Sequence, residues 1–325
     1  MRGVLLERYG PPSEGLRLAD LPTPEPAPGQ VRLRVRAAAL NAYDWHLYRG
    51  DPFLARIAFG LRRPRPRLLG IDAAGAIEAV GAGVTAFAVG DRVAGVVDSG
   101  TFAEQIVADA GLLARIPDGM PFTTAAALPG AGLTALQGLR GSGIRDGMRV
   151  LVIGASGGVG HYAVQLARAL GASRVVAVCS GGNAAMLKGL GADRVIDYAR
   201  ERVTDADERF DLVFDTVGTT TLRRLSRVME RDAVYAPVGG VGGGWLLGPA
   251  WAIYRSVPAS WFLPQRVAPV SVEPSGPAVA ELLALAAADA VRPVIERVHP
   301  LEEYGQALER LESKRVAGKL VLELG

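Results

Sequence analysis

The chain has 325 residues, of which 49% are hydrophobic and 21% are charged, a composition that indicates a soluble globular protein. Because one compact core seldom holds this many residues, we expect two domains. The formal net charge of +3 says little about binding partners. The only cysteine, Cys179, excludes an internal disulfide framework and a thiolate zinc cluster, and it fits a location in the reducing cytoplasm.

Two segments bear on membrane targeting. The first apolar residues run directly into Glu7 and Arg8, so they do not form the apolar core of a signal peptide. Residues 233–254 carry no charge, but they include six glycines and two prolines. A membrane helix needs about 20 residues of sustained helical character. We therefore expect a strand, a glycine loop and a short apolar helix here, and no membrane partner.

The N-terminal hundred residues have the pattern of a β-domain. Residues 31–36 alternate between apolar and charged side chains, which is the period of a half-buried strand. Further strands are expected at 76–80, 92–97 and 102–108, and turn residues such as Gly90 and Asp91 separate them.

The pattern changes near residue 117, where strands begin to alternate with helices. We expect strands at 149–153, 174–179, 194–196, 212–215, 233–238 and 268–272, and helices at 159–170, 184–190 and 220–230. This alternation predicts βαβ units and a parallel sheet. The tail then predicts helices at 277–288 and 301–312 and strands at 293–298 and 319–324.

A glycine-rich turn stands between the first strand and the first helix of this α/β part, from Gly154 to Gly160. Glycines allow close approach to a pyrophosphate, and the N–H groups at the start of a helix stabilise its negative charge. The spacing departs from G-x-G-x-x-G because Ser156 occupies the middle glycine position. The residues expected to bind the dinucleotide are Ser156, Gly157, Gly158 and Val159.

The end of the second strand indicates which dinucleotide is bound. NAD-binding proteins usually place an acid there to bind the ribose hydroxyls, but residues 178–183 contain none. Ser180 and Asn183 can donate hydrogen bonds to a 2′-phosphate, and Tyr198 can add another. This pattern favours NADPH. The loop has no Arg or Lys, and an ordinary polar turn is the alternative reading.

Several stretches together resemble the zinc-free medium-chain dehydrogenases/reductases, and the resemblance covers essentially the whole chain. The matching segments are 40–46, 49–50, 69–75, 89–93, 131–135, 189–193 and 317–321. The resemblance implies an α/β fold with a GroES-like β-rich catalytic domain and a Rossmann domain with a doubly wound parallel sheet. The expected domains are residues 1–117, residues 118–273 for the nucleotide, and residues 274–325, which complete the catalytic domain.

Whether the chain can hold a catalytic zinc ion depends on the residues at three positions. Zinc members of this family carry Cys at the position of Asn41, His and Glu at 71–72 and often Cys near Gly130. Catalytic zinc needs three side-chain ligands, which Asn41, Ile71 and Gly130 cannot supply. We therefore expect no metal.

Without a metal, the chemistry favours an easily reduced substrate. A simple alkoxide needs a Lewis acid or an activated tyrosine, and no tyrosine here has Lys four positions later. The resemblance implies an NADPH-dependent reductase of quinones or α,β-unsaturated carbonyls, which needs mainly a dry, positioned pocket and a proton source. The alternatives are a zinc-free alcohol or aldehyde oxidoreductase of a biosynthetic pathway, and a non-catalytic NADPH-binding protein with a structural or nucleic-acid role.

The resemblance also assigns site residues. Asn41 would face nicotinamide and substrate, Asp44 would be a polar site residue, and His46 would bind the carbonyl or donate a proton. Tyr43 and water are other proton sources, and packing against Trp45 is the alternative role for His46. The remaining expected cofactor contacts are Thr134 at the start of a helix, Gly218 and Gly239 at strand ends, and Lys319.

Two further features have several readings. The run from Arg62 to Arg67 contains four arginines and can attract nucleic acid, but its prolines and lack of aromatic residues favour a solvated loop near the substrate cleft. Trp245, Trp251, Trp261 and Phe262 form either core or dimer packing or an apolar lid. The resemblance implies a homodimer, and the strand at 268–272 is a candidate edge for it.

Overall fold

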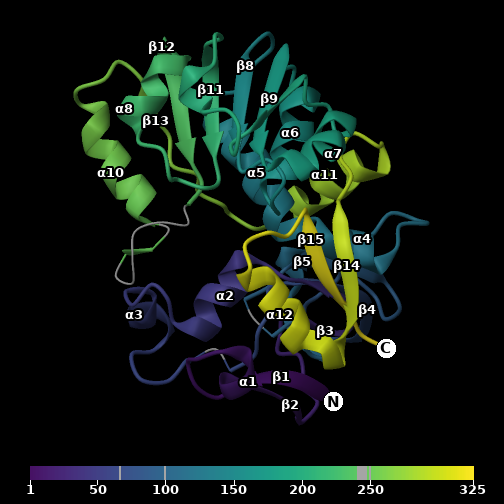
Figure 1. The fold of residues 1–325 in the computed structure, drawn as a ribbon. Coiled ribbons are helices and arrows are strands. Elements are labelled where there is room, and N and C mark those ends of the chain that lie inside the picture. The colour runs from purple at the N-terminus through teal and green to yellow at the C-terminus, as the bar shows by residue number, and fades with distance from the viewer. Residues whose placement is uncertain (66, 99, 240–246, 249) are drawn as a thin grey trace. The chain divides into compact units, whose positions relative to one another are not determined.

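The computed structural model describes residues 1–65, 67–98, 100–239, 247–248 and 250–325, and these form two compact units (Figure 1). Unit 1 comprises Met1–Leu133, Glu273–Asp289 and Pro293–Gly325, and unit 2 comprises Thr134–Val272 and Ala290–Arg292. The first division falls inside helix α5 (Pro129–Gly141), whereas the sequence places the domain boundary at residue 117. Helix α4 (Phe122–Ala127) belongs to unit 1 because it packs on strands of that unit.

Unit 1 is built on a sheet of seven strands that runs β14-β15-β3-β4-β5-β7, with β6 paired to β3. Its strands are β3 (Gln30–Ala39), β4 (Asp72–Val80), β5 (Arg92–Val96), β6 (Gln105–Asp109), β7 (Leu113–Arg115), β14 (Ile295–Pro300) and β15 (Lys319–Glu323). A hairpin of β1 (Arg2–Leu6) and β2 (Leu16–Asp20) accompanies this sheet. Its helices are α1 (Pro12–Gly15), α2 (Ala42–Arg49), α3 (Ala55–Phe59), α4, α11 (Gly276–Ala287) and α12 (Tyr304–Glu312), with 3-10 turns at Ala110–Leu112 and Leu301–Glu303.

Strand β3 shows why the sheet of unit 1 forms. Val31, Leu33 and Val35 are fully buried, and the arginines between them face outward or lie half-buried, as the alternation predicts. Strand β15, from the C-terminal tail, pairs antiparallel with the end of β3. The tail therefore completes the sheet that the N-terminal part begins, and it brings Lys319 next to the end of β3.

Unit 2 is a six-stranded sheet in the order β10-β9-β8-β11-β12-β13, parallel throughout. Its strands are β8 (Arg149–Ile153), β9 (Arg174–Cys179), β10 (Arg194–Asp197), β11 (Phe210–Asp215), β12 (Met229–Pro237) and β13 (Arg266–Val267). Its helices are α6 (Gly160–Ala169), α7 (Ala184–Gly189), α8 (Leu222–Leu225) and α10 (Ala250–Ser260), with 3-10 turns at Gly181–Asn183, Val203–Asp205 and Ser226–Val228. Buried strands such as β9 read as continuous apolar runs because both faces of a parallel sheet are covered.

The predicted fold class is confirmed: a β-rich unit accompanies a parallel-sheet α/β unit (Figure 1). Several predicted elements are wrong in their bounds. The helix expected at 220–230 ends at Leu225 and passes through a 3-10 turn into β12, which begins at Met229. The edge strand expected at 268–272 is instead β13, at Arg266–Val267.

The helix that contains Thr134 begins at Pro129 and not at Thr134. Proline is favoured in the first turn of a helix because its missing N–H has no helical partner there, so the start could have been read from Pro129. The uncharged segment 233–254 contains the end of β12 and the start of α10, and its glycine loop lies outside the described residues. Among the described helices, none combines the length and the apolar character needed to cross a membrane.

Candidate active site

The N-terminus of α2 holds the first candidate residues of unit 1. Asn41 precedes the helix in an extended conformation, as a helix N-cap residue does. The carboxylate of Asp44, three residues later, accepts a hydrogen bond from the backbone N–H of Asn41 at 2.7 Å and another from that of Gly70 at 3.1 Å. Asp44 is completely buried. Its side chain therefore has a structural role: it links the start of α2 to Gly70, which precedes β4.

The side-chain amide of Asn41 is held at both ends. Its Nδ2 donates to Asp72 Oδ2 at 2.9 Å and to the carbonyl of Ala39 at 3.3 Å, and its Oδ1 accepts from Lys319 Nζ at 2.6 Å. An amide has two donor hydrogens and two acceptor lone pairs. Both donors are thus engaged, and the oxygen accepts from Lys319 and, in a capping box, from the backbone N–H of Asp44.

Lys319 and Asp72 form a buried ion pair behind this amide. The Lys319 ammonium lies 3.7 Å from Asp72 Oδ2 and donates to the carbonyl of Leu40 at 2.9 Å, and the two side chains are 2% and 0% exposed. The other carboxylate oxygen of Asp72 accepts from the backbone N–H of Gly130 at 2.9 Å. A Cβ at position 130 would lie 2.7 Å from that oxygen, so glycine is the residue that permits this contact.

Burial shifts the ionisation of the three charged groups in this cluster. It raises the pKa of Asp44 to about 7, against the hydrogen bond from Asn41. Burial also raises the pKa of Asp72 and lowers that of Lys319, while the contact between the two opposes both shifts. The charge of one ammonium cannot neutralise two carboxylates. The cluster can consequently take up or release a proton near neutral pH, with Asp44 as the carboxylate that ionises there.

His46 lies on the same helix but outside this cluster. Its Nδ1 is 2.6 Å from the carbonyl oxygen of Asp51, and its ring meets the Trp45 ring edge-on at 4.4 Å between centroids. A carbonyl only accepts, so Nδ1 carries the hydrogen and Nε2 is an acceptor in the neutral ring. Burial lowers the pKa of His46. This shift favours the neutral ring at neutral pH, and the predicted catalytic role of His46 stays a prediction.

In unit 2 the glycine turn runs from β8 into α6. Gly154 has φ +76°, and a Cβ there would lie 2.3 Å from Thr216 Oγ1; a Cβ on Gly160 would lie 2.2 Å from the carbonyl oxygen of Gly154. These glycines are required by close packing. In the described part of the chain, the N–H groups of Ser156, Gly158 and Val159 donate no backbone hydrogen bond. They remain available to an anion at the start of α6.

The loop after β9 contains the residues expected to select the dinucleotide. Asn183 Nδ2 donates to Ser180 Oγ at 3.2 Å, and Tyr198 is 67% exposed after the neighbouring strand β10. Sequence reasoning missed Asp197, which ends β10 opposite Cys179. A Cβ on Gly181 would lie 2.5 Å from Asp197 Oδ2. A carboxylate from the adjacent strand thus borders a loop that lacks one of its own.

The remaining predicted cofactor residues lie at strand ends or in a helix. Gly218 has φ +67° and donates its N–H at 2.8 Å to Asp215, whose other oxygen accepts from the Tyr235 hydroxyl at 2.9 Å. Gly239 follows β12, and Thr134 lies inside α5. Gly218 is thus fixed by Asp215 at the carboxyl end of β11, where open parallel sheets bind ligands.

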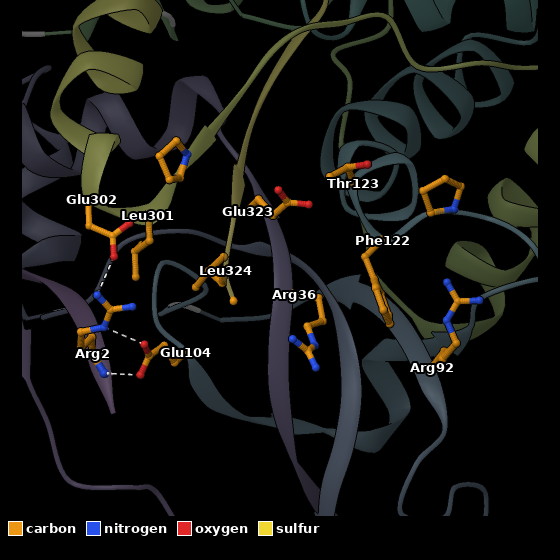
Figure 2. A pocket seen from close by; sticks show the side chains of 13 residues that line it. Arg2, Arg36, Arg92, Glu104, Phe122, Thr123, Leu301, Glu302, Glu323 and Leu324 are labelled. Atoms are coloured by element: carbon orange, nitrogen blue, oxygen red, sulfur yellow. Dashed lines mark hydrogen bonds and ion pairs between the residues drawn. The ribbon is translucent and has the colours of Figure 1, made fainter.

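A pocket of about 790 Å³ lies elsewhere in unit 1, and none of the predicted site residues line it (Figure 2). Arg2 bridges Glu104 and Glu302 in its wall, with Nε 2.7 Å from Glu104 and a terminal nitrogen 2.5 Å from Glu302. Arg92 lies over the ring of Phe122 at 4.5 Å. Arg2 is thus paired with two carboxylates, and Arg92 contacts the ring of Phe122 and the carbonyl of Met120.

Comparisons with known proteins agree over nearly the whole chain. Residues 27–118 match the family model of the alcohol dehydrogenase GroES-like domain, and residues 190–322 match that of the zinc-binding dehydrogenases. A chloroplast envelope quinone oxidoreductase homolog of Arabidopsis thaliana is 30% identical over 339 residues, which cover 99% of this chain and 98% of that protein.

Two solved structures extend this similarity. The quinone oxidoreductase of Coxiella burnetii has a TM-score of 0.87 at 30% identity and covers 100% of this chain and 99% of its own. The Escherichia coli quinone oxidoreductase complexed with NADPH has a TM-score of 0.85 at 25% identity, with 99% and 100% covered. The chain belongs to the medium-chain dehydrogenase/reductase superfamily. As the sequence predicts, it is an oxidoreductase of the quinone oxidoreductase-like group.

Members of this superfamily differ in whether they hold zinc, and the donor set of this chain bears on that difference. Asn41 is engaged with Asp72 and Lys319, Ile71 has no donor atom, and Gly130 contributes only a backbone N–H. Among the described residues, no three His, Cys, Asp or Glu side chains are grouped so as to hold a metal ion. These residues do not fit a catalytic zinc site.

The sequence alone does not identify the partners of Asn41. Asp72 stands out only as a carboxylate within the apolar run 71–77, and a buried carboxylate needs a partner. Lys319, predicted to contact the cofactor, is that partner and is 2% exposed. Whether its ammonium also contacts a bound cofactor stays a prediction.

Proposed function

We propose that this protein is an NADPH-dependent, zinc-independent reductase that transfers a hydride to a quinone or an α,β-unsaturated carbonyl compound. The observation that carries the proposal is the Asn41 amide, held by Lys319 and Asp72 at the position where zinc members have a metal ligand. A superfamily member that has an amide and an ion pair in place of that metal ligand needs a substrate that can accept a hydride without the help of a Lewis acid.

The glycine turn of unit 2 fits the pyrophosphate of a dinucleotide. The backbone N–H groups of Ser156, Gly158 and Val159 would bind it at the start of α6, and Gly157 leaves room for its approach. Bound NADPH supplies the hydride. The similarity to the Escherichia coli enzyme, solved with NADPH, supports this choice of cofactor.

The loop after β9 supports NADPH over NADH through its hydroxyl and amide groups. Ser180 and Asn183 would donate to the 2′-phosphate, and the exposed Tyr198 hydroxyl can add a further hydrogen bond. Asp197 acts against this preference because its carboxylate repels a phosphate. We therefore propose a preference for NADPH that is limited by Asp197.

In unit 1, the amide of Asn41 is engaged by protein groups through both its nitrogen and its oxygen. Its role would be to position the start of α2 beside the bound molecules, and not to stabilise an oxyanion, because it has no free donor. In a quinone or enone, the charge that develops on hydride addition spreads onto the carbonyl oxygen. A proton completes the product, and His46, Tyr43 and water are its candidate sources.

We further propose that the protein forms a homodimer and is located in the cytoplasm. The β13 edge of the six-stranded sheet, Arg266–Val267, has no further strand beside it among the described residues. Pairing of this edge with that of a second copy would give a homodimer. The single cysteine, Cys179, is buried and has no second cysteine in the chain with which to form a disulfide, which suits the reducing cytoplasm.

Deuterium transfer tests the proposed reaction. NADPH labelled with deuterium at nicotinamide C4 is incubated with a linear enone and metal-free protein, and the product is analysed by mass spectrometry and NMR. We expect one deuterium at the carbon β to the carbonyl when the label is on the transferred face, and none when it is on the other face. Deuterium at the carbonyl carbon would instead indicate an alcohol or aldehyde oxidoreductase.

A further inference from the structure

The chain between Asp51 and Asp72 has five arginines and no acidic residue. Four of them, Arg62, Arg63, Arg65 and Arg67, follow α3 and are exposed. Among the described residues, none of these four guanidinium groups makes a hydrogen bond or an ion pair with the protein. Elsewhere most exposed arginines of unit 1, such as Arg2 and Arg17, are paired with glutamates. The four thus present positive charge that no protein group in the described part of the chain neutralises.

Large apolar side chains are exposed immediately before these arginines. Ile57 is 62% exposed and Leu61 is 60% exposed. Phe53 and Leu54 are 40% and 39% exposed. Ile57 lies in α3, Phe53 and Leu54 directly precede this helix, and Leu61 follows Gly60, whose φ of +113° ends it. Four large apolar residues so close together are a concentrated patch, unlike the single exposed apolar residues that are normal on protein surfaces.

The opposite side of this segment is fastened to unit 1. Arg56 lies over the Tyr9 ring at 4.5 Å, and its Nε donates to the carbonyl of Gly50 at 2.9 Å. The Tyr9 hydroxyl donates to the carbonyl of Gly60 at 2.7 Å, and Pro64 is buried. The inward side is therefore satisfied by protein contacts, while Ile57, Leu61 and the four arginines that follow are exposed to solvent.

We propose that this segment docks on an anionic lipid surface. Phe53, Leu54, Ile57 and Leu61 would enter the boundary between headgroups and acyl chains, and the four arginines would bind the phosphates of the headgroups. Apolar side chains next to unpaired basic ones are the combination by which a protein binds a membrane surface without crossing it. The sequence alone favours a solvated loop, because the exposure of Ile57 and Leu61 cannot be read from it.

Charge and side-chain type argue against two other occupants. Binding of single-stranded nucleic acid relies on stacked aromatic rings beside basic residues, whereas the most exposed residues here, Ile57 and Leu61, are aliphatic. A two-fold contact with a second copy would bring the same four arginines of both copies together, which is repulsive. Membrane docking does not depend on the reductase activity, so the two proposals can fail separately.

Vesicle co-sedimentation of the full chain tests the proposal. The probes are phosphatidylcholine vesicles, alone and with about 30% phosphatidylglycerol, at about 0.1 M and about 0.5 M salt. The variants are Arg62→Gln/Arg63→Gln/Arg65→Gln/Arg67→Gln and Ile57→Ser/Leu61→Ser. The matched control, Arg223→Gln/Arg224→Gln/Arg227→Gln/Arg231→Gln, removes the same charge from exposed arginines of unit 2. Thermal unfolding and NADPH binding establish that each variant is folded.

We expect binding to the anionic vesicles only, weakened by salt, and reduced at least about tenfold in both segment variants but not in the control. Equal binding by the control and the arginine variant would overturn the assignment to this segment, as would no binding by the natural chain. Binding to a DNA or RNA oligonucleotide but not to vesicles would assign the arginines to nucleic acid. A dimer in light scattering that Ile57→Ser/Leu61→Ser dissociates would assign the patch to a second copy.

Discussion

The ammonium group of Lys319 lies 2.6 Å from the side-chain oxygen of Asn41, although 278 positions of the sequence separate the two residues. Strand β15 pairs antiparallel with the end of β3, and Asn41 follows β3. The C-terminal tail thus supplies the cation that orients an amide near the N-terminus. Removing this ammonium group should therefore lower the stability of unit 1 and disturb the orientation of the Asn41 amide.

Lys319→Met is expected to destabilise unit 1 by about 3–5 kcal/mol, because it leaves the Asp72 carboxylate buried without its partner. Asp72→Asn in the same chain should recover part of the loss, since the double variant no longer has the Asp72 charge that Lys319 balanced. Urea denaturation of the natural chain, both single variants and the double variant measures the coupling. Additive losses would mean that the two side chains do not act as a pair.

Asn41→Ala should lower kcat for a quinone about tenfold or more while the dissociation constant for NADPH changes little. The reason is that the amide belongs to unit 1, whereas the glycine turn expected to bind NADPH belongs to unit 2. Stopped-flow kinetics measure the first quantity and nicotinamide fluorescence the second. An unchanged kcat would show that the Asn41 side chain does not contribute to the reaction.

The pKa of Asp44, raised to about 7 by burial, makes folding depend on pH. Between about pH 4 and pH 7 the unfolded chain has released this proton and the folded chain still holds it, so stability falls as pH rises across this interval, by up to roughly 4 kcal/mol. Above about pH 7 this contribution to the pH dependence ends.

Asp44→Asn should be less stable overall, because Asn41 and Gly70 donate to different oxygens of the carboxylate and the amide replaces one of these oxygens with an NH2 donor. Its stability should nevertheless decline less between pH 5 and pH 8 than that of the natural chain. Urea denaturation of both chains at the two pH values measures this difference. The other titrating groups contribute equally to the two chains, so their effect cancels in the comparison. Parallel pH profiles would show that Asp44 titrates normally in the folded protein.

Cofactor preference should respond in opposite directions to two charge changes. Ser180→Asp places a carboxylate at the end of β9 and should lower the ratio of kcat/KM for NADPH over NADH about tenfold or more. Asp197→Asn removes the neighbouring carboxylate and should raise that ratio, while its side-chain oxygen can still accept from Ala199. Initial rates with both cofactors measure the ratio. A ratio unchanged in both variants would place the 2′-phosphate elsewhere.

The strands and helices of unit 2 follow from the sequence because each carries a local signal. Strands β8 and β9 have the predicted bounds, since both are apolar runs ended by glycine or polar turns. The predicted helix at 220–230 is too long because the change from helix to strand at Met229 is set by pairing of β12 with β11, a contact that local pattern does not contain.

The candidate site could be predicted only in part. The position of Asn41 and the glycine turn can be read from short motifs. The contacts of Lys319 and Asp72 depend on β15 joining β3, and the proximity of Asp197 to Gly181 depends on the register of β10 with β9. Such contacts join residues far apart in the chain, and no periodicity within one segment encodes them.

The most direct test of the proposed function is NADPH consumption by metal-free protein in the presence of a chelator. The acceptors are 1,4-benzoquinone, 9,10-phenanthrenequinone, a linear enone and an aldehyde, with a simple alcohol and NADP in the reverse direction and NADH in parallel. We expect oxidation of NADPH by the quinones or the enone, undiminished by the chelator and much slower with NADH. Turnover of the aldehyde or alcohol alone, or activity that returns only when zinc is added, would contradict the proposal.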